Sequence, residues 1–202
     1  MNFKLKPTNN VTNEPVSLAT AQLHLKLDLV GSPPSHPDDA LVLSMITAAR
    51  QDAEKYTGLA VAYQTYQLAL DAFPRHAIDL GIWPVSQVVS ITYVDRAGVT
   101  QTLSAANYTL DTFARPSVIH PTVIWPDTKE MPNAVVVTFR AGFTDGQSPN
   151  SYPVPKAITQ AMLLMIGHLY ENREAVNVGS IVTTYPLGYL HLLTPHRLGM
   201  GL

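Results

Sequence analysis

The hydrophobic pattern of this chain changes period twice, and this change constrains the fold more than any other feature. Towards both ends, apolar residues recur every three or four positions, which is the spacing of an amphipathic helix. Between Gly58 and about Gly142 they alternate instead, as along Tyr66, Leu68 and Leu70, which is the spacing of a half-buried strand. The sequence therefore predicts an α+β fold, in which a β-rich insertion interrupts a helical body.

The longest helical pattern begins near Pro153 and continues to Glu174. Pro155 suits the first turn of this helix, because its missing N–H would be unpaired there anyway. The apolar residues of one face are Ile158, Ala161, Met162, Met165 and Leu169. We interpret this Met-rich stripe as core rather than as a docking surface, because Met fills irregular gaps in a core.

Two further helical patterns precede the β region. Ser17 has the side chain of a helix N-cap, and Asp38 and Asp39 stand where carboxylates favour the start of a second helix. Gly58 follows this second helix at the position where a glycine commonly ends one. The expected buried residues of the second helix are Val42, Met45, Ile46, Ala49, Ala53 and Tyr56.

The middle of the chain has the signals of strands and a hairpin. β-branched and alternating runs at 66–70, 87–94 and 134–139 predict strands, and the loop Asp95–Gly98 joins the second run to a further strand as a hairpin. The segment 142–155 is rich in Gly, Pro, Ser and Asn and marks a joint. We expect residues 1–59 and 146–202 to form the helical body with a C-terminal tail, and residues 60–145 to form the β-rich insertion.

Composition excludes several classes of function. The chain has 202 residues, of which 46% are hydrophobic, so it can form one or two domains with a core. A net charge of −2 provides no basic excess for sequence-specific DNA binding, and the absence of cysteine excludes disulfides and thiolate metal sites. Neither a signal peptide nor a membrane-spanning run is present in this sequence, so we expect a protein made in the cytoplasm, with no membrane partner.

No residue pattern predicts catalysis. The sequence lacks the G-x-S-x-G turn of many serine hydrolases, and no glycine-rich segment continues into the Gly-Lys-Ser/Thr of a phosphate-binding loop. His168 and Glu171 are three residues apart, but no second His-rich helix completes a metal site. We therefore expect no enzyme activity, cofactor or metal. One alternative stays open, a small hydrolase or ligand-binding module that uses a cleft between the helices and the β region.

Charge and apolar surface concentrate towards the C-terminus. Arg173 complements the dipole at the end of the long helix, whereas Glu171 and Glu174 oppose it and require partners from their own helix or from a neighbouring subunit. The tail from Val176 to Leu202 is apolar but interrupted by prolines and glycines. We expect this tail to be poorly ordered in an isolated subunit and to order on docking; the alternative is permanent packing on its own subunit.

Several short motifs occur in a distinctive order over nearly the whole chain. They are Pro15-Val-Ser-Leu-Ala-Thr-Ala21, Asp38-Asp-Ala-Leu41, Ala48-Ala-Arg50, Thr57-Gly58, Trp83-Pro84-Val85, Tyr93-Val-Asp95, Val137-Thr-Phe-Arg-Ala-Gly-Phe143, His168-Leu-Tyr-Glu-Asn-Arg-Glu174 and Leu192-Leu-Thr-Pro-His-Arg197. In this order the sequence resembles the head-tail connector (adaptor) family of tailed phages, in the branch with a β insertion. His196 departs from the pattern, since the family has another aromatic residue there.

The resemblance implies a structural protein of the virion neck, made in the host cytoplasm. It would form a ring, a dodecamer in the virion, beneath the portal protein and would dock a neck or tail-completion protein. Double-stranded DNA would pass through the channel without sequence-specific binding. The residues expected to contact a neighbouring subunit or partner are Tyr170, Glu171, Arg173, Glu174, Leu190, Leu193 and Arg197.

Overall fold

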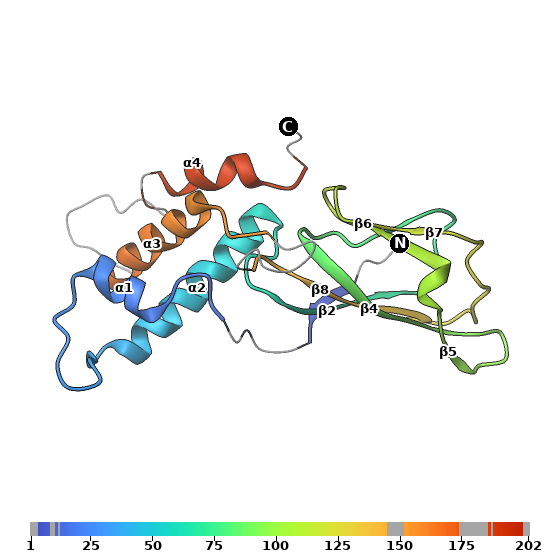
Figure 1. The fold of residues 1–202 in the computed structure, drawn as a ribbon, viewed down its shortest axis with the longest axis horizontal. Helices are drawn as coiled ribbons and strands as arrows, with labels where there is room; N and C mark the ends of the chain where they lie inside the picture. The colour runs from blue at the N-terminus through green and yellow to red at the C-terminus, as the bar shows by residue number, and fades with distance from the viewer. Residues whose placement is uncertain are drawn as a thin grey trace. The chain divides into compact units, whose positions relative to one another are not determined.

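The computed structural model describes residues 4–8, 11, 13–144, 152–173, 186 and 188–199. Its described residues form an α+β fold with four α-helices and two antiparallel sheets, divided into two compact units (Figure 1). The β unit comprises Met1–Thr12 and Gly58–Pro153, and the helical unit comprises Asn13–Thr57 and Val154–Met200. The expectation that the N-terminal residues belong to the helical body is wrong, because β1 (Lys4–Pro7) pairs with β2 (Gln64–Leu70) of the β unit.

The larger sheet has the strand order β1-β2-β8-β4-β5 and is antiparallel at every pairing. Its other strands are β4 (Val85–Val94), β5 (Thr100–Thr102) and β8 (Val135–Ala141). The predicted runs 66–70 and 87–94 fall within β2 and β4, and the predicted run 134–139 overlaps β8, which begins one residue later, at Val135. The predicted hairpin is also confirmed: Gly98 N–H donates to the Asp95 carbonyl at 2.9 Å, and a φ of +84° at Gly98 explains the glycine.

The smaller sheet has the order β3-β7-β6, from β3 (Ile78–Asp79), β6 (Tyr108–Asp111) and β7 (Val118–Pro121), of which Figure 1 labels β6 and β7. Both sheets contribute to one hydrophobic core, because Leu68, Val137 and Phe139 of the larger sheet cluster with Ile78 and Ile119 of the smaller one. All five side chains are almost completely buried. This shared core leaves the opposite face of the larger sheet free of core residues.

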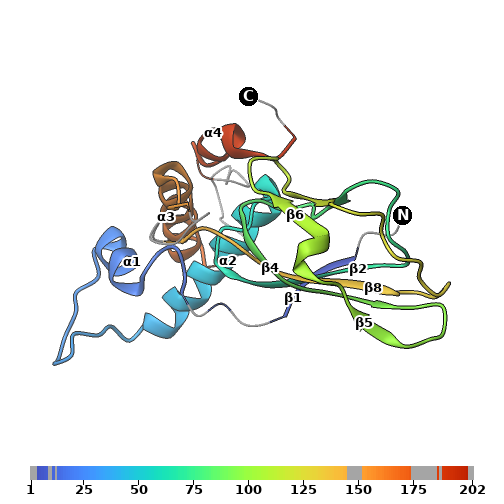
Figure 2. The same ribbon diagram turned by 45° about the vertical axis from the view of Figure 1, so that its right-hand side comes forward.

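The helical unit consists of α1 (Leu18–Leu25), α2 (Asp39–Thr57), α3 (Lys156–Glu171) and α4 (Tyr189–Leu193). In both views α2 and α3 lie side by side, and α1 and α4 pack on them (Figures 1 and 2). Ser17 caps α1 as predicted, since its Oγ accepts the Thr20 N–H. The core interpretation of the α3 stripe is confirmed at Ile158, Ala161, Met162 and Met165, which are buried.

Helix α3 is shorter than the helix predicted over residues 153–174. It ends at Glu171, because the backbone of Asn172 leaves the helical conformation, with φ −116° and ψ 65°. The Asn172 backbone N–H and side-chain Nδ2 both donate to the His168 carbonyl, at 3.0 and 2.9 Å, and so cap this end. Arg173 therefore follows the helix rather than lying in its last turn. Glu174 lies outside the described residues.

Candidate subunit and partner interface

Three charged or polar side chains meet where α2 begins and α3 ends. The Tyr170 hydroxyl donates to Asp38 Oδ2 at 2.7 Å, and Arg173 Nη2 lies 2.6 Å from the same oxygen. The Arg173 guanidinium carbon also lies 4.4 Å from the centre of the Tyr170 ring. The counter-ion of Arg173 is therefore Asp38 of its own chain, a residue that sequence reasoning assigned only to the helix start.

The electrostatics of this cluster fix its protonation state. The Tyr170 hydrogen bond and then the Arg173 guanidinium lower the pKa of Asp38 below its ordinary value. The same hydrogen bond, donated to a carboxylate, raises the pKa of Tyr170. At neutral pH the cluster is consequently a carboxylate, a neutral phenol and a guanidinium, which together have no net charge.

Arg173 retains hydrogen-bonding capacity for another chain. Its Nε donates to the Tyr170 carbonyl at 3.3 Å and its Nη2 to Asp38, while 47% of the side chain is exposed. A guanidinium has five N–H donors, so three of them have no hydrogen-bond partner among the described residues. Glu171 is exposed beside it and makes no ion pair within the same set of residues. This end of the helical unit thus presents both charge signs to solvent.

The far end of α2 is covered by the described part of the tail. Tyr189 and Leu193 of α4 are completely buried, and the Tyr189 hydroxyl donates to Asp52 Oδ2 at 2.6 Å. Beyond α4, the Leu198 N–H donates to the Thr57 carbonyl at 2.7 Å. The expectation of a poorly ordered tail is therefore wrong for residues 188–199, which pack on their own subunit; the apolar residues Ile181, Val182 and Leu187 lie outside the described residues.

This packing buries one of the expected contact residues of the tail and leaves two of them exposed. Leu193 is fully buried in its own subunit and presents no surface to a partner, so that assignment is wrong. Leu190, in the same helix, is 37% exposed, and Arg197 is exposed with its guanidinium carbon 5.4 Å from the Tyr56 ring. Leu190 and Arg197 therefore stay candidates for a partner contact.

The remaining candidates fall into two groups at opposite ends of α2. Tyr170 and Arg173 contact Asp38, and Glu171 follows Tyr170 as the last residue of α3, whereas Arg197 lies against Tyr56. A rise of about 1.5 Å per residue makes α2 roughly 28 Å long. The structure thus provides two distinct charged surfaces on one helical unit rather than one continuous patch.

A buried ion network, which sequence reasoning missed, connects the segment before α1 to α2. Only 6% of the Arg50 side chain is exposed; its Nε lies 2.8 Å from Glu14 Oε2 and its Nη1 2.6 Å from Glu54 Oε2. Arg50 and Glu54 stand four residues apart on a helix, which is the one sequence signal for this network. We assign it to stability, because both partners of Arg50 belong to the same unit.

The described residues present neither a metal site nor a membrane segment. No group of three His, Asp or Glu side chains in them is arranged to hold a metal ion. No helix within the described ranges is long and apolar enough to cross a membrane.

No family model and no curated protein matches this sequence. Solved structures of gene transfer agent (GTA) particles do contain similar chains. One, from the neck of an empty GTA particle computed with C6 symmetry, is 26% identical with a TM-score of 0.78. Chains of the same identity occur in the virion of the native particle and in its neck computed with C12 symmetry, with TM-scores of 0.75 and 0.74.

Each of these matches covers 98% of this chain and 97% of the other chain. The similarity therefore extends over both units and is not limited to a common small motif. Together with the fold, it supports a phage-like structural protein of a particle neck.

Proposed function

We propose that this chain is a structural head-tail connector of a tailed phage, a prophage or a related particle, and that it forms a ring below the portal. The observation that carries the proposal is the match to neck chains along 98% of the sequence. In this proposal a helical connector body bears a β-rich insertion, and the ring continues the DNA channel. The chain acts in the virion neck, after synthesis in the host cytoplasm, and catalyses no reaction.

The symmetry of the similar necks supports a ring, since they were computed with C6 and C12 symmetry. A ring requires that one surface of each subunit bind a different surface of the next. The two groups at opposite ends of α2 meet that requirement, and they include opposite charges, the Glu171 carboxylate and the Arg197 guanidinium. We assign these two side chains to a contact between neighbouring subunits, with Arg173 and Leu190 beside them.

The other partners follow from the position of such a ring. One side binds the portal protein and the other binds a neck or tail-completion protein. Double-stranded DNA passes through without sequence-specific recognition, which agrees with a net charge of −2. The ring in the virion has twelve subunits.

A charge exchange tests the subunit contact together with ring formation. Glu171→Arg and Arg197→Glu each place like charges at the contact, so each variant should form fewer rings in native mass spectrometry than the unaltered protein. The double variant restores opposite charges and should recover ring formation. Arg75→Glu, which reverses the charge of an exposed residue of the β unit outside both groups, is the control.

Two results would count against the proposal. If the unaltered chain forms no ring at any concentration tested, with or without a portal protein, the connector function is wrong. If rings form but neither single variant reduces them, the function stands and the assignment of Glu171 and Arg197 is wrong.

A further inference from the structure

The larger sheet has one face that the core does not use. Successive residues of a strand point to opposite faces, and Leu68, Val137 and Ile91 point into the core. Their neighbours along the strands point outwards, and the strand register aligns these neighbours in rows across the sheet. One such row consists of Lys6, Gln67, Thr138 and Ser90.

The next row has the same chemistry. It consists of Thr65, Arg140 and Gln87, which face one another on β2, β8 and β4. Like the first row, it combines a cation with hydroxyl and amide groups, and neither row contains a carboxylate or an aromatic side chain. We call these two rows the outer face.

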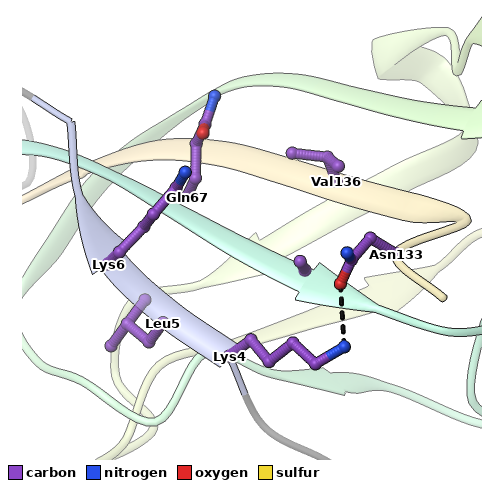
Figure 3. Close-up of a pocket in the computed structure, with 7 residues that line it drawn as sticks. Lys4, Leu5, Lys6, Gln67, Asn133 and Val136 are labelled. Carbon is purple, nitrogen blue, oxygen red and sulfur yellow. Dashed lines mark hydrogen bonds between the residues drawn. The ribbon is translucent and has the colours of Figure 1, made fainter.

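A shallow hollow of about 400 Å³ lies on this side of the sheet, beside β1 (Figure 3). Lys6 and its cross-strand partner Gln67 line the hollow together with Lys4 and Asn133. Lys4 Nζ donates to Asn133 Oδ1 at 3.0 Å and lies 3.4 Å from Asp71 Oδ1, so its charge is already balanced. The exposed cations Lys6 and Arg140 have no ion pair within the described residues.

We propose that the outer face contacts the phosphate backbone of double-stranded DNA. This inference rests on the proposed ring and identifies which surface of the subunit faces the channel. Lys and Arg side chains, hydroxyl groups and amides are the groups that bind phosphate oxygens without reading sequence. A carboxylate would repel the backbone, and the two rows contain none, although the whole chain has a net charge of −2.

The spacing of the two cations suits one duplex. Lys6 and Arg140 are separated by two strand spacings of about 4.8 Å and by two residues along the strands, so their Cα atoms are about 12 Å apart. A duplex presents a phosphate charge about every 1.7 Å of its axis, so both side chains reach phosphates of the same molecule. The two rows of the outer face contain only two cations, Lys6 and Arg140, so the contact is weak, as the movement of DNA through a channel requires.

Paired charge-removing variants test this inference. The test variant is Lys6→Gln with Arg140→Gln. The control is Arg75→Gln with Lys129→Gln, which removes two exposed cations of the β unit outside the outer face. Binding of the full-length protein to a fluorescent 30-base-pair duplex is measured by anisotropy at increasing sodium chloride, and native mass spectrometry and thermal unfolding are recorded for the same samples.

The unaltered protein should bind the duplex at low salt, and the control should bind equally well. The test variant should bind at least tenfold more weakly, and the slope of log K against log salt should fall by about 1.8 for two lost phosphate contacts. Its ring formation and melting temperature should not change.

Three outcomes would overturn the inference. They are an absence of DNA binding by the unaltered protein, an equal loss of binding in test and control variants, and full DNA binding by the test variant. If the test variant keeps DNA binding but loses rings or portal binding, the outer face contacts an acidic protein surface instead. Failure of the unaltered chain to form rings would refute the proposed function separately.

Discussion

Leu193→Ala tests whether α4 is a fixed part of its own subunit. The Leu193 side chain is completely buried, and the substitution removes three carbon atoms from that site. At about 0.8 kcal/mol for each buried methylene, the lost transfer free energy is about 2.4 kcal/mol. The cavity left behind adds to this, so the free energy of unfolding should fall by about 3 to 5 kcal/mol.

Leu190→Ala is the matched control, because it makes the same chemical change in the same helix at a side chain that is 37% exposed. About two thirds of the transfer term applies there and no closed cavity forms, so the cost should stay below about 1.5 kcal/mol. Its main effect should be weaker ring formation, since Leu190 is a proposed contact residue.

Urea unfolding of the dissociated subunit, followed by circular dichroism, measures both variants. A cost below about 1 kcal/mol for Leu193→Ala, or equal costs for the two variants, would show that α4 does not pack on its subunit in solution. Leu193 would then be a candidate for a partner contact again.

Three further changes test other parts of the structure. The folded-state pKa of Asp38 is lowered, so its contribution to stability is present above the ordinary carboxyl pKa of about 3.9 and is lost as the pH falls through the lower folded-state value. Asp38→Asn should therefore remove part of the acid dependence of the melting temperature, and a melting temperature with an unchanged pH profile would contradict this. Arg50→Leu should lower the free energy of unfolding in urea by about 3 kcal/mol, because it removes the cation between two largely buried carboxylates. An unchanged free energy of unfolding would show that the Arg50 ion network is not formed. Gly142→Ala should lower the melting temperature strongly and the free energy of unfolding by more than about 3 kcal/mol. The reason is that Gly142 has a φ of +125° and that a Cβ there would overlap the backbone of Ala62. A melting temperature equal to that of the unaltered protein would contradict this backbone geometry.

The parts of the fold that sequence reasoning predicted have local signals. Ser17 caps α1, the stripe that begins at Val42 identifies α2, and the Asp95–Gly98 loop identifies a hairpin, all within a few residues of the element concerned. The smaller sheet has no such signal, because strands of two to four residues are too short to establish a period. β1 was missed for a similar reason, since Leu5 is its one aliphatic side chain apart from Pro7 and its pairing partner is more than fifty residues away.

Sequence reasoning identified most residues of the candidate interface but not the contacts among them. The sequence identifies the charges at the end of α3, but the partner of Arg173 is Asp38, 135 residues earlier, and no local pattern connects them. Leu190 and Leu193 illustrate a second limit. A helix of five residues has too few positions for periodicity to decide which of two leucines is buried, so only tertiary packing distinguishes them.

Electron microscopy of the purified full-length chain, alone and mixed with the portal protein of the same genome, tests the connector proposal most directly. We expect closed rings of sixfold or twelvefold symmetry with a central opening, and stacking of these rings on the portal in the mixture. A monomer under both conditions, at concentrations where portal rings are intact, would contradict it.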